Sequence, residues 1–149
     1  MAQPVGHVIG VEEELRGSII PGVPDLLGRI DLLIETDDAV IIADLKTSRS
    51  RWSRGQAEDS SEQLLLYAEF VKSLVHGKQM RLQFVVLSKT KEPVVGVHEL
   101  LVVPQQVNRT KRIVKRVLRS IDAGLFYPAP SPMQCPSCPY REPCRAWTG

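Results

Sequence analysis

The stretch GRIDLLIETDDAVIIADLKTS, residues 28–48, decides the fold. It holds two apolar runs, residues 30–35 and 40–47, on either side of the polar segment TDDA, and this pattern predicts a β-hairpin. Each run carries an aspartate, Asp31 in the first and Asp44 in the second, although a buried strand disfavours charge. An account of this protein therefore has to explain the two carboxylates.

The turn fixes how the two aspartates relate to each other. If it is symmetric about Asp37 and Asp38, cross-strand partners have residue numbers that sum to 75, and Asp31 lies opposite Asp44. Like charges so placed, with Cβ atoms about 4.5–5.5 Å apart, destabilise a sheet. A divalent cation between them offsets the repulsion, and hard oxygen ligands suit Mg²⁺ or Mn²⁺. The alternative is that both are strand-end residues paired with Arg29 and Lys46.

Alternation along the strands predicts the two faces of the hairpin. Because successive side chains point to opposite faces, Lys46 shares a face with Asp44. We expect this face to be the chemical one. The core face is then expected to carry Ile30, Leu32, Ile41, Ala43 and Leu45.

The rest of the chain predicts an α/β or α+β layer with a mixed sheet. Further strands are expected over residues 8–15, 80–88 and 94–103, and amphipathic helices over residues 61–75 and 105–123, with Asp59 or Ser60 as a helix cap. The polar segment 48–61 breaks the pattern. We expect one core domain over residues 1–128 and a tail rich in proline and cysteine over residues 129–149.

Composition bounds the class of protein. The 149 residues contain no apolar stretch long enough to span a membrane, and the N-terminus lacks the pattern of a signal peptide, so we expect a cytoplasmic protein without a membrane partner. Residues 46–149 hold seventeen basic against eight acidic residues, an asymmetry that hints at nucleic acid. Three cysteines within ten residues argue for a ligand cluster rather than a disulfide framework.

Three motifs in order resemble the PD-(D/E)XK nuclease superfamily, specifically its RecB-family exonuclease domains. They are the GxxD strand ending at Asp31, the D-x-K strand Asp44-Leu45-Lys46, and the Q-x3-Y helix with Gln63 and Tyr67. The resemblance implies a restriction-endonuclease-like core, with a central mixed sheet flanked by helices. From spacing alone, Gln63 could instead be a capping partner of Ser60, and Tyr67 could be a core residue.

The resemblance also implies roles for the motif residues. Asp31 and Asp44 bind Mg²⁺ or Mn²⁺ with the Leu45 carbonyl, and Lys46 orients or activates the attacking water. Glu12 in the segment VEEEL matches an acidic residue that assists the metal, with Glu14 as the second choice. The expected activity is hydrolysis of DNA phosphodiester bonds by an exonuclease-like enzyme, in DNA repair or recombination, beside a helicase or recombination protein. The rival interpretation is an incomplete or inactive nuclease-fold module that binds DNA or assembles with partners.

The cysteines Cys135, Cys138 and Cys144 resemble the C-terminal part of the iron–sulfur staple in AddB-type and CRISPR-adaptation nucleases. The fourth cysteine of that pattern is absent here, and so is an upstream metal-binding histidine. The site could hold a [4Fe-4S] cluster completed by another ligand, or Zn²⁺ with a histidine, or nothing. Solvated or core roles are expected for the histidines, His7, His76 and His98.

Two basic segments are candidate DNA contacts. The segment after the D-x-K strand combines an aromatic with basic residues, which suits single-stranded DNA or DNA ends. The charges of residues 105–123 surround an apolar stripe and are more typical of a solvated helix face. We therefore expect the first segment to bind DNA, through Arg49, Arg51, Trp52 and Arg54.

Overall fold

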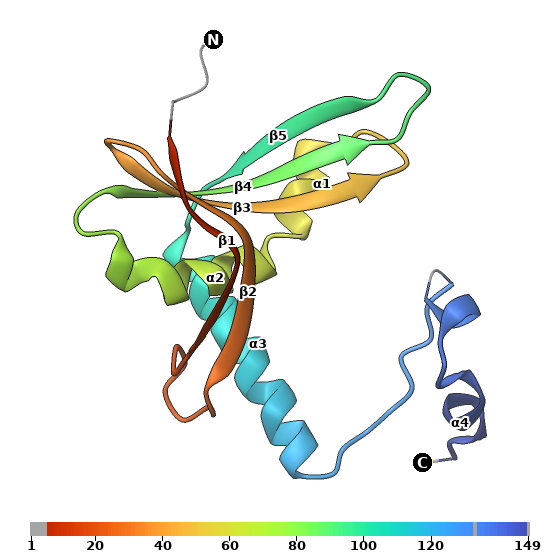
Figure 1. Cartoon of the computed structure of the whole chain (residues 1–149). Coiled ribbons are helices and arrows are strands. Elements are labelled where there is room, and N and C mark those ends of the chain that lie inside the picture. Colours follow the sequence, from red (N-terminus) through yellow and green to blue (C-terminus); the bar gives the residue numbers. More distant parts are fainter. Residues whose placement is uncertain (1–5, 133, 149) are drawn as a thin grey trace. The chain divides into compact units, whose positions relative to one another are not determined.

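The computed structural model describes residues 6–132 and 134–148 and centres on a five-stranded sheet (Figure 1). The strands follow chain order from one edge to the other. They are β1 (His7–Gly17), β2 (Leu26–Glu35), β3 (Ala39–Ser48), β4 (Gln79–Ser88) and β5 (Val94–Leu100). Only the β3–β4 pair is parallel, so the sheet is mixed as predicted.

Helices connect and cover the strands. The crossover from β3 to β4 contains α1 (Arg54–Asp59), α2 (Glu62–Val71) and the 3₁₀ turn η1 (Lys72–Leu74). After β5 comes α3 (Pro104–Asp122), and the tail carries the 3₁₀ turn η2 (Cys135–Ser137) and α4 (Arg141–Ala146). The predicted α/β class is confirmed, with the two long helices within one or two residues of their expected starts.

The chain divides by its contacts into two compact units, residues 1–113 and 114–149. The first holds the whole sheet, α1, α2 and the start of α3. The second holds the end of α3, η2 and α4. Over the part of the chain that the structure describes, no helix is long and apolar enough to cross a membrane.

The core of the first unit lies between the sheet and its helices. Apolar side chains of α2 recur at helical spacing and pack on the central strands, which explains why this segment is helical. The cluster also takes in Ala57 of α1 and Val107 of α3. From the sheet and α2 its members include Ile30, Leu33, Val40, Ile42, Leu64, Leu65, Ala68, Val71, Leu82, Phe84 and Val86.

The predicted assignment of the two sheet faces is wrong at Asp44 and Leu45, although Ile30, Ile41 and Ala43 are buried as expected. Asp44 pairs with Phe84 across β3 and β4, and residues directly opposite each other share a face. Since Phe84 is in the core, Asp44 lies on the core face too, whereas Leu45 on the other face is 52% exposed. The reason is that the core covers β3 only as far as Asp44, so the chemical groups occupy the end of the core face.

Alternation also fails within β2. Ile30 and Leu33 both belong to the core cluster, although a strict period of two would place them on opposite faces. The alternation is interrupted at Asp31 and Leu32, which are both half-buried. Before and after these two residues, opposite faces of β2 contribute to the core cluster. Leu32 is therefore not the core residue that the sequence predicted.

The polar segment 48–61 contains α1, which the sequence analysis missed. Ser53 is its N-cap: its hydroxyl accepts a hydrogen bond from the backbone N of Gln56, and the Gln56 side chain accepts one from the backbone N of Ser53. This reciprocal capping box, Ser-x-x-Gln, was readable in the sequence. The helix is short and buries only Ala57, so apolar periodicity gave no indication of it.

Candidate active site

The ladder between β2 and β3 stops at the two aspartates. Its pairs run from Glu35 and Val40 to Leu32 and Ala43, and every pair sums to 75, which confirms the predicted register. Asp31 and Asp44 occupy the next position, where the ladder no longer continues. Figure 1 shows β1 and β2 curving away from β3, β4 and β5 beyond this point. The carboxylates therefore lie where the sheet forks.

A side chain replaces the missing ladder bond at the fork. The carboxylate oxygen Oδ2 of Asp31 accepts a hydrogen bond from the backbone N of Leu45 at 2.7 Å. This bond ties the first strand of the hairpin to the D-x-K segment of the second. It fixes the backbone at Leu45, and it holds the Asp31 carboxylate beside β3.

Asp44 is the buried acid of the pair, with 3% of its surface exposed. Burial raises the pKa of its carboxyl above the usual range, and the negative charge of Asp31 adds to the rise, while the ammonium of Lys46 opposes it. The Lys46 Nζ lies 2.6 Å from Oδ2 of Asp44. The predicted neighbourhood of Lys46 and Asp44 is therefore present. This contact also matches half of the alternative in which the aspartates pair with flanking basic residues.

The Oδ2 atom of Asp44 is the strongest indication of a ligand. Among residues 6–132 and 134–148 it meets no donor of good hydrogen-bond geometry, and the Lys46 ammonium 2.6 Å away supplies its counter-charge. Burial of a carboxylate is costly, and two nearby carboxylates on a fork are hard ligands for a divalent cation. The residues fit Mg²⁺ or Mn²⁺, although among the described residues no group of three or more His, Cys, Asp or Glu converges on one point.

Phe84, which the sequence analysis did not single out, lies next to the Asp44–Lys46 ion pair. The Lys46 Nζ lies 6.0 Å from the centroid of the Phe84 ring, at the outer limit of a cation–π contact. His98 on β5 is the next residue across the sheet from Phe84. Alternation within residues 80–88 could have shown that Phe84 faces the same side as its neighbours Leu82 and Val86.

Gln63 and Tyr67 meet on one face of α2, as expected from their spacing. The Gln63 side-chain nitrogen donates a hydrogen bond to the Tyr67 hydroxyl at 2.6 Å, and the Tyr67 ring is buried. Gln63 is therefore not a capping partner of Ser60, because the N-cap of α2 is Ser61, without a side-chain cap hydrogen bond. The core role considered for Tyr67 is present, together with a polar end fixed by Gln63.

Gly28, the first residue of the GxxD motif, explains how α2 approaches β2 so closely. A Cβ atom at this position would lie 2.9 Å from Cε2 of Phe70 and 3.1 Å from Cε1 of Tyr67. Only glycine leaves room for both rings here. The motif thus combines a packing residue for α2 with the carboxylate three positions later.

Glu12 has an ion pair of its own. Its Oε2 lies 2.8 Å from Nε of Arg29, and both side chains are largely exposed. The backbone at Glu12 has φ of 52°, in the left-handed region that non-glycine residues rarely adopt. Glu12 interrupts β1 opposite the irregular part of β2, between the pairs Val11–Leu32 and Glu13–Ile30. Its role in metal binding, and that of Glu14, stay predictions.

The segment after β3 is only in part an open loop. Trp52 is half-buried against the core, with its ring 5.3 Å from that of Phe84 and 6.4 Å from that of His98. Arg54 begins α1, and its Nε lies 2.8 Å from Oε1 of Glu58. Arg49 and Arg51 are exposed. DNA contact by this segment stays a prediction, and the structure gives Trp52 a packing role that the sequence did not indicate.

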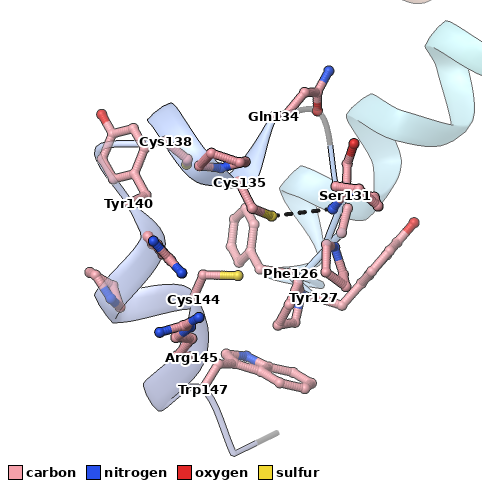
Figure 2. A pocket seen from close by; sticks show the side chains of 17 residues that line it. Phe126, Tyr127, Ser131, Gln134, Cys135, Cys138, Tyr140, Cys144, Arg145 and Trp147 are labelled. Atoms are coloured by element: carbon pink, nitrogen blue, oxygen red, sulfur yellow. Dashed lines mark hydrogen bonds between the residues drawn. The ribbon is translucent and has the colours of Figure 1, made fainter.

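The three cysteines of the tail are free and half-buried, and they line one pocket (Figure 2). The Sγ of Cys135 accepts a hydrogen bond from the backbone N of Ser131 at 3.2 Å. Iron–sulfur clusters normally take four thiolates, whereas the chain has three cysteines, and no metal-binding group of His, Cys, Asp or Glu forms among the described residues. These residues do not make a complete cluster site.

Residues 3–145 match the family described as the PD-(D/E)XK nuclease superfamily. No curated protein matches this chain significantly.

Two solved structures share the fold. One is a protein of Eubacterium rectale assigned as an exonuclease, with a TM-score of 0.63 and 15% identity over 94% of this chain and 53% of that one. The other is the protein SSO0001, with a TM-score of 0.56 and 16% identity over 92% of this chain and 60% of that one. The chain therefore spans little more than half the length of these two proteins.

Proposed function

Since this chain belongs to the PD-(D/E)XK nuclease superfamily, we propose that it is a metal-dependent deoxyribonuclease whose active site is the fork at Asp31, Asp44 and Lys46. The observation that carries the proposal is the buried carboxylate of Asp44, which stands one position beyond the end of the β2–β3 ladder, level with Asp31, with the Lys46 ammonium 2.6 Å from its Oδ2. Lys46 supplies one positive charge for the two carboxylates, and a divalent cation would balance both.

Asp31 and Asp44 would hold Mg²⁺ or Mn²⁺, with the Leu45 carbonyl as a further oxygen ligand. The cation would lower the pKa of a bound water and neutralise charge that develops on the phosphate. Asp31 is already oriented by the backbone of Leu45, so little rearrangement is needed at this carboxylate. Lys46 now neutralises Asp44, and once the aspartates have another counter-charge its ammonium is free to face a phosphate oxygen or the attacking water.

Gln63 and Tyr67 support the same site from α2. Their hydrogen bond holds the Gln63 amide at a defined position, and the amide oxygen stays available as an acceptor. We assign this pair to contact with the DNA backbone near the fork. Arg49 and Arg51 extend the proposed contact surface, since both are exposed and directly follow the strand that carries Asp44 and Lys46.

We extend the proposal to exonuclease action of the RecB type, in DNA repair or recombination beside a helicase. The ordered motifs at Asp31, Asp44 and Gln63 support it, and so does the likeness in fold to the Eubacterium rectale protein assigned as an exonuclease. An iron–sulfur cluster or zinc ion at the tail is left out of the proposal, because the three thiolates do not complete a site.

The test is cleavage of end-labelled single- and double-stranded DNA by the whole chain, with Mg²⁺, Mn²⁺ or EDTA. We expect cleavage that EDTA abolishes and that Asp44→Asn removes. Lys46→Met is expected to lower the rate by about 10²–10³-fold, as for loss of one electrostatic group in a transition state.

The matched controls are the same two types of substitution at an aspartate and a lysine outside the fork. Asp37→Asn alters an exposed aspartate in the hairpin turn, and Lys72→Met alters an exposed lysine of η1. Both should cleave at the wild-type rate. DNA and Mn²⁺ binding without any cleavage would contradict the proposed enzyme and favour a nuclease-fold binding module.

A further inference from the structure

The aromatic residues of this chain fall into two groups of four. Trp52, Tyr67, Phe70 and Phe84 belong to the core cluster of the sheet unit or pack against it. The other four lie within the last 24 residues and are all exposed: Phe126, Tyr127, Tyr140 and Trp147. Large exposed apolar side chains that gather in one place mark an interaction site.

These four aromatic residues line a single pocket of the tail, taken to include Phe126, Tyr127 and Pro128 before residue 129. The pocket has a volume of about 920 Å³ and is formed entirely by residues 126–147 (Figure 2). Ligand pockets commonly hold roughly 300–1,000 Å³, so there is room for more than one flat ring. Among the residues that the structure describes, no leucine, isoleucine or valine lines it. A groove built to receive an aliphatic face of another protein would be expected to contain such residues.

The charge of the lining is positive. Arg141 and Arg145, one turn apart on α4, both line the pocket. Glu142, on the same helix, is not among the lining residues, and within the described part of the chain no aspartate or glutamate lines the pocket. Aromatic rings with arginines and no acid are the combination that binds single-stranded nucleic acid, because bases stack on the rings while phosphates pair with the cations.

Five prolines in the lining bear on how the rings are presented. Each fixes its own φ near −65° and restricts the preceding residue, so the backbone loses less freedom when a ligand binds. They are Pro128, Pro130, Pro132, Pro136 and Pro143. The aromatic rings are therefore attached to a backbone with few accessible conformations, although little of this segment is helical.

We propose that this pocket is a binding site for single-stranded DNA, separate from the fork at Asp31 and Asp44. Tyr127, Tyr140 and Trp147 stack on bases, and Arg141 and Arg145 pair with phosphates. The inference rests on the proposed function for its choice of DNA as the polyanion. A site of this kind gives the nuclease a second hold on its substrate strand.

The test uses the fluorescence of Trp147. The chain has two tryptophans, and Trp52→Phe leaves Trp147 as the single reporter in the otherwise whole protein. It is titrated with oligo-dT in EDTA, which prevents cleavage. Saturable quenching by oligo-dT, absent with a blunt duplex, is expected. If Trp52→Phe does not fold, the difference between wild type and Trp147→Phe in the same titration gives the same readout. An unchanged Trp147 signal at saturating oligo-dT overturns the proposal.

Matched substitutions separate base stacking from other kinds of docking. Tyr127→Phe keeps the ring and should bind as wild type, whereas Tyr127→Leu should weaken binding by about 5- to 150-fold, the loss typical of one stacked base. Equal affinity of the two variants for oligo-dT would mean that no base stacks on this ring, and would overturn the proposal. Each of Arg141→Gln and Arg145→Gln should lower the slope of log Kd against log salt by about 0.7.

Failure of this inference and failure of the proposed function are distinguishable. Cleavage of DNA with no response of Trp147 leaves the nuclease intact and overturns the tail site. Quenching of Trp147 in a chain that never cleaves DNA supports the tail site and overturns the enzyme.

Discussion

In the sheet unit, Tyr67 and Phe84 are buried among aliphatic side chains, whereas in the tail Tyr127 and Tyr140 are 77% and 72% exposed. The same residue type stabilises the fold in one region and is left open to solvent in the other. Burial of an aromatic ring contributes free energy to folding, while an exposed ring contributes little and stays available for a ligand. The contrast teaches that stability and ligand binding are separable in this chain, residue by residue.

The largest expected effect comes from removing one aromatic ring from each region, which tests whether only the buried rings stabilise the fold. Phe84→Ala should lower the free energy of unfolding by about 3–5 kcal/mol, because a fully buried ring leaves a cavity. Tyr140→Ala should change it by no more than about 0.5 kcal/mol. Urea unfolding followed by far-ultraviolet circular dichroism measures both. Similar losses in the two variants would mean that the tail ring is part of the folded core.

A smaller loss is expected where α2 packs on β2. Gly28→Ala should destabilise the fold by about 1–3 kcal/mol, since its Cβ would meet the rings of Phe70 and Tyr67. Gly17→Ala is the matched control, because a Cβ there meets nothing within 4 Å. The pair is compared by urea unfolding. An equal cost at both positions would show that glycine matters for its backbone alone.

A single hydroxyl in the core gives a still smaller effect. Tyr67→Phe keeps the buried ring and removes the partner of the Gln63 amide, so we expect a loss of about 0.5–1.5 kcal/mol. Tyr127→Phe in the tail should leave stability unchanged. A double-mutant cycle with Gln63→Ala isolates the hydrogen bond, and a coupling energy of zero would contradict it.

At the fork, unlike in the three preceding cases, removal of a native group is expected to stabilise the fold. The pKa of Asp44 is raised in the folded state, so the folded protein binds this proton more readily than the unfolded chain. For this group alone, stability is therefore lowest above the folded pKa, rises as the pH falls through it, and is fully regained below the unfolded value of about 3.8.

Asp44→Asn removes that unfavourable charge and should raise the thermal midpoint at neutral pH in EDTA, while it abolishes cleavage. The difference in thermal midpoint between Asp44→Asn and wild type should shrink as the pH is lowered. Thermal melts over a pH series measure this difference. Asp37→Asn, in the exposed turn, should have the same thermal midpoint as wild type. A difference for Asp44→Asn that grows on acidification would contradict the raised pKa of Asp44.

The sequence predicted the topology and the hairpin register because both depend on local rules. A symmetric turn at Asp37 and Asp38 is enough to place Asp31 and Asp44 at one level, and the ladder confirms this register. Alternation is enough to place Lys46 beside Asp44. The motif residues Gln63 and Tyr67 meet because residues four apart share a helix face.

What the sequence could not predict depends on tertiary packing. Residues 39–44 of β3 are buried on both faces, and α1 and α2 add to the core on the face of Asp44 and Phe84. Alternation within β3 therefore does not show which face the helices cover. The irregularity of β2 at Asp31 has no counterpart in the local sequence. The packing of Trp52 on Phe84 and His98 joins residues far apart in the chain, so its basic neighbours suggested an open loop instead.

The position of β3 between an early and a late partner has a consequence for folding kinetics. The β2–β3 hairpin closes a short loop, whereas Ala39 pairs with Gln79 of β4, forty residues later, across a crossover that contains two helices. Short loops close at lower entropic cost and usually sooner. We therefore expect the two carboxylates to meet while both are still hydrated, and to be desolvated only when β4 adds its edge. The unfavourable burial of Asp44 then falls on the pairing of β4 with β3, and it slows this step rather than the formation of the hairpin.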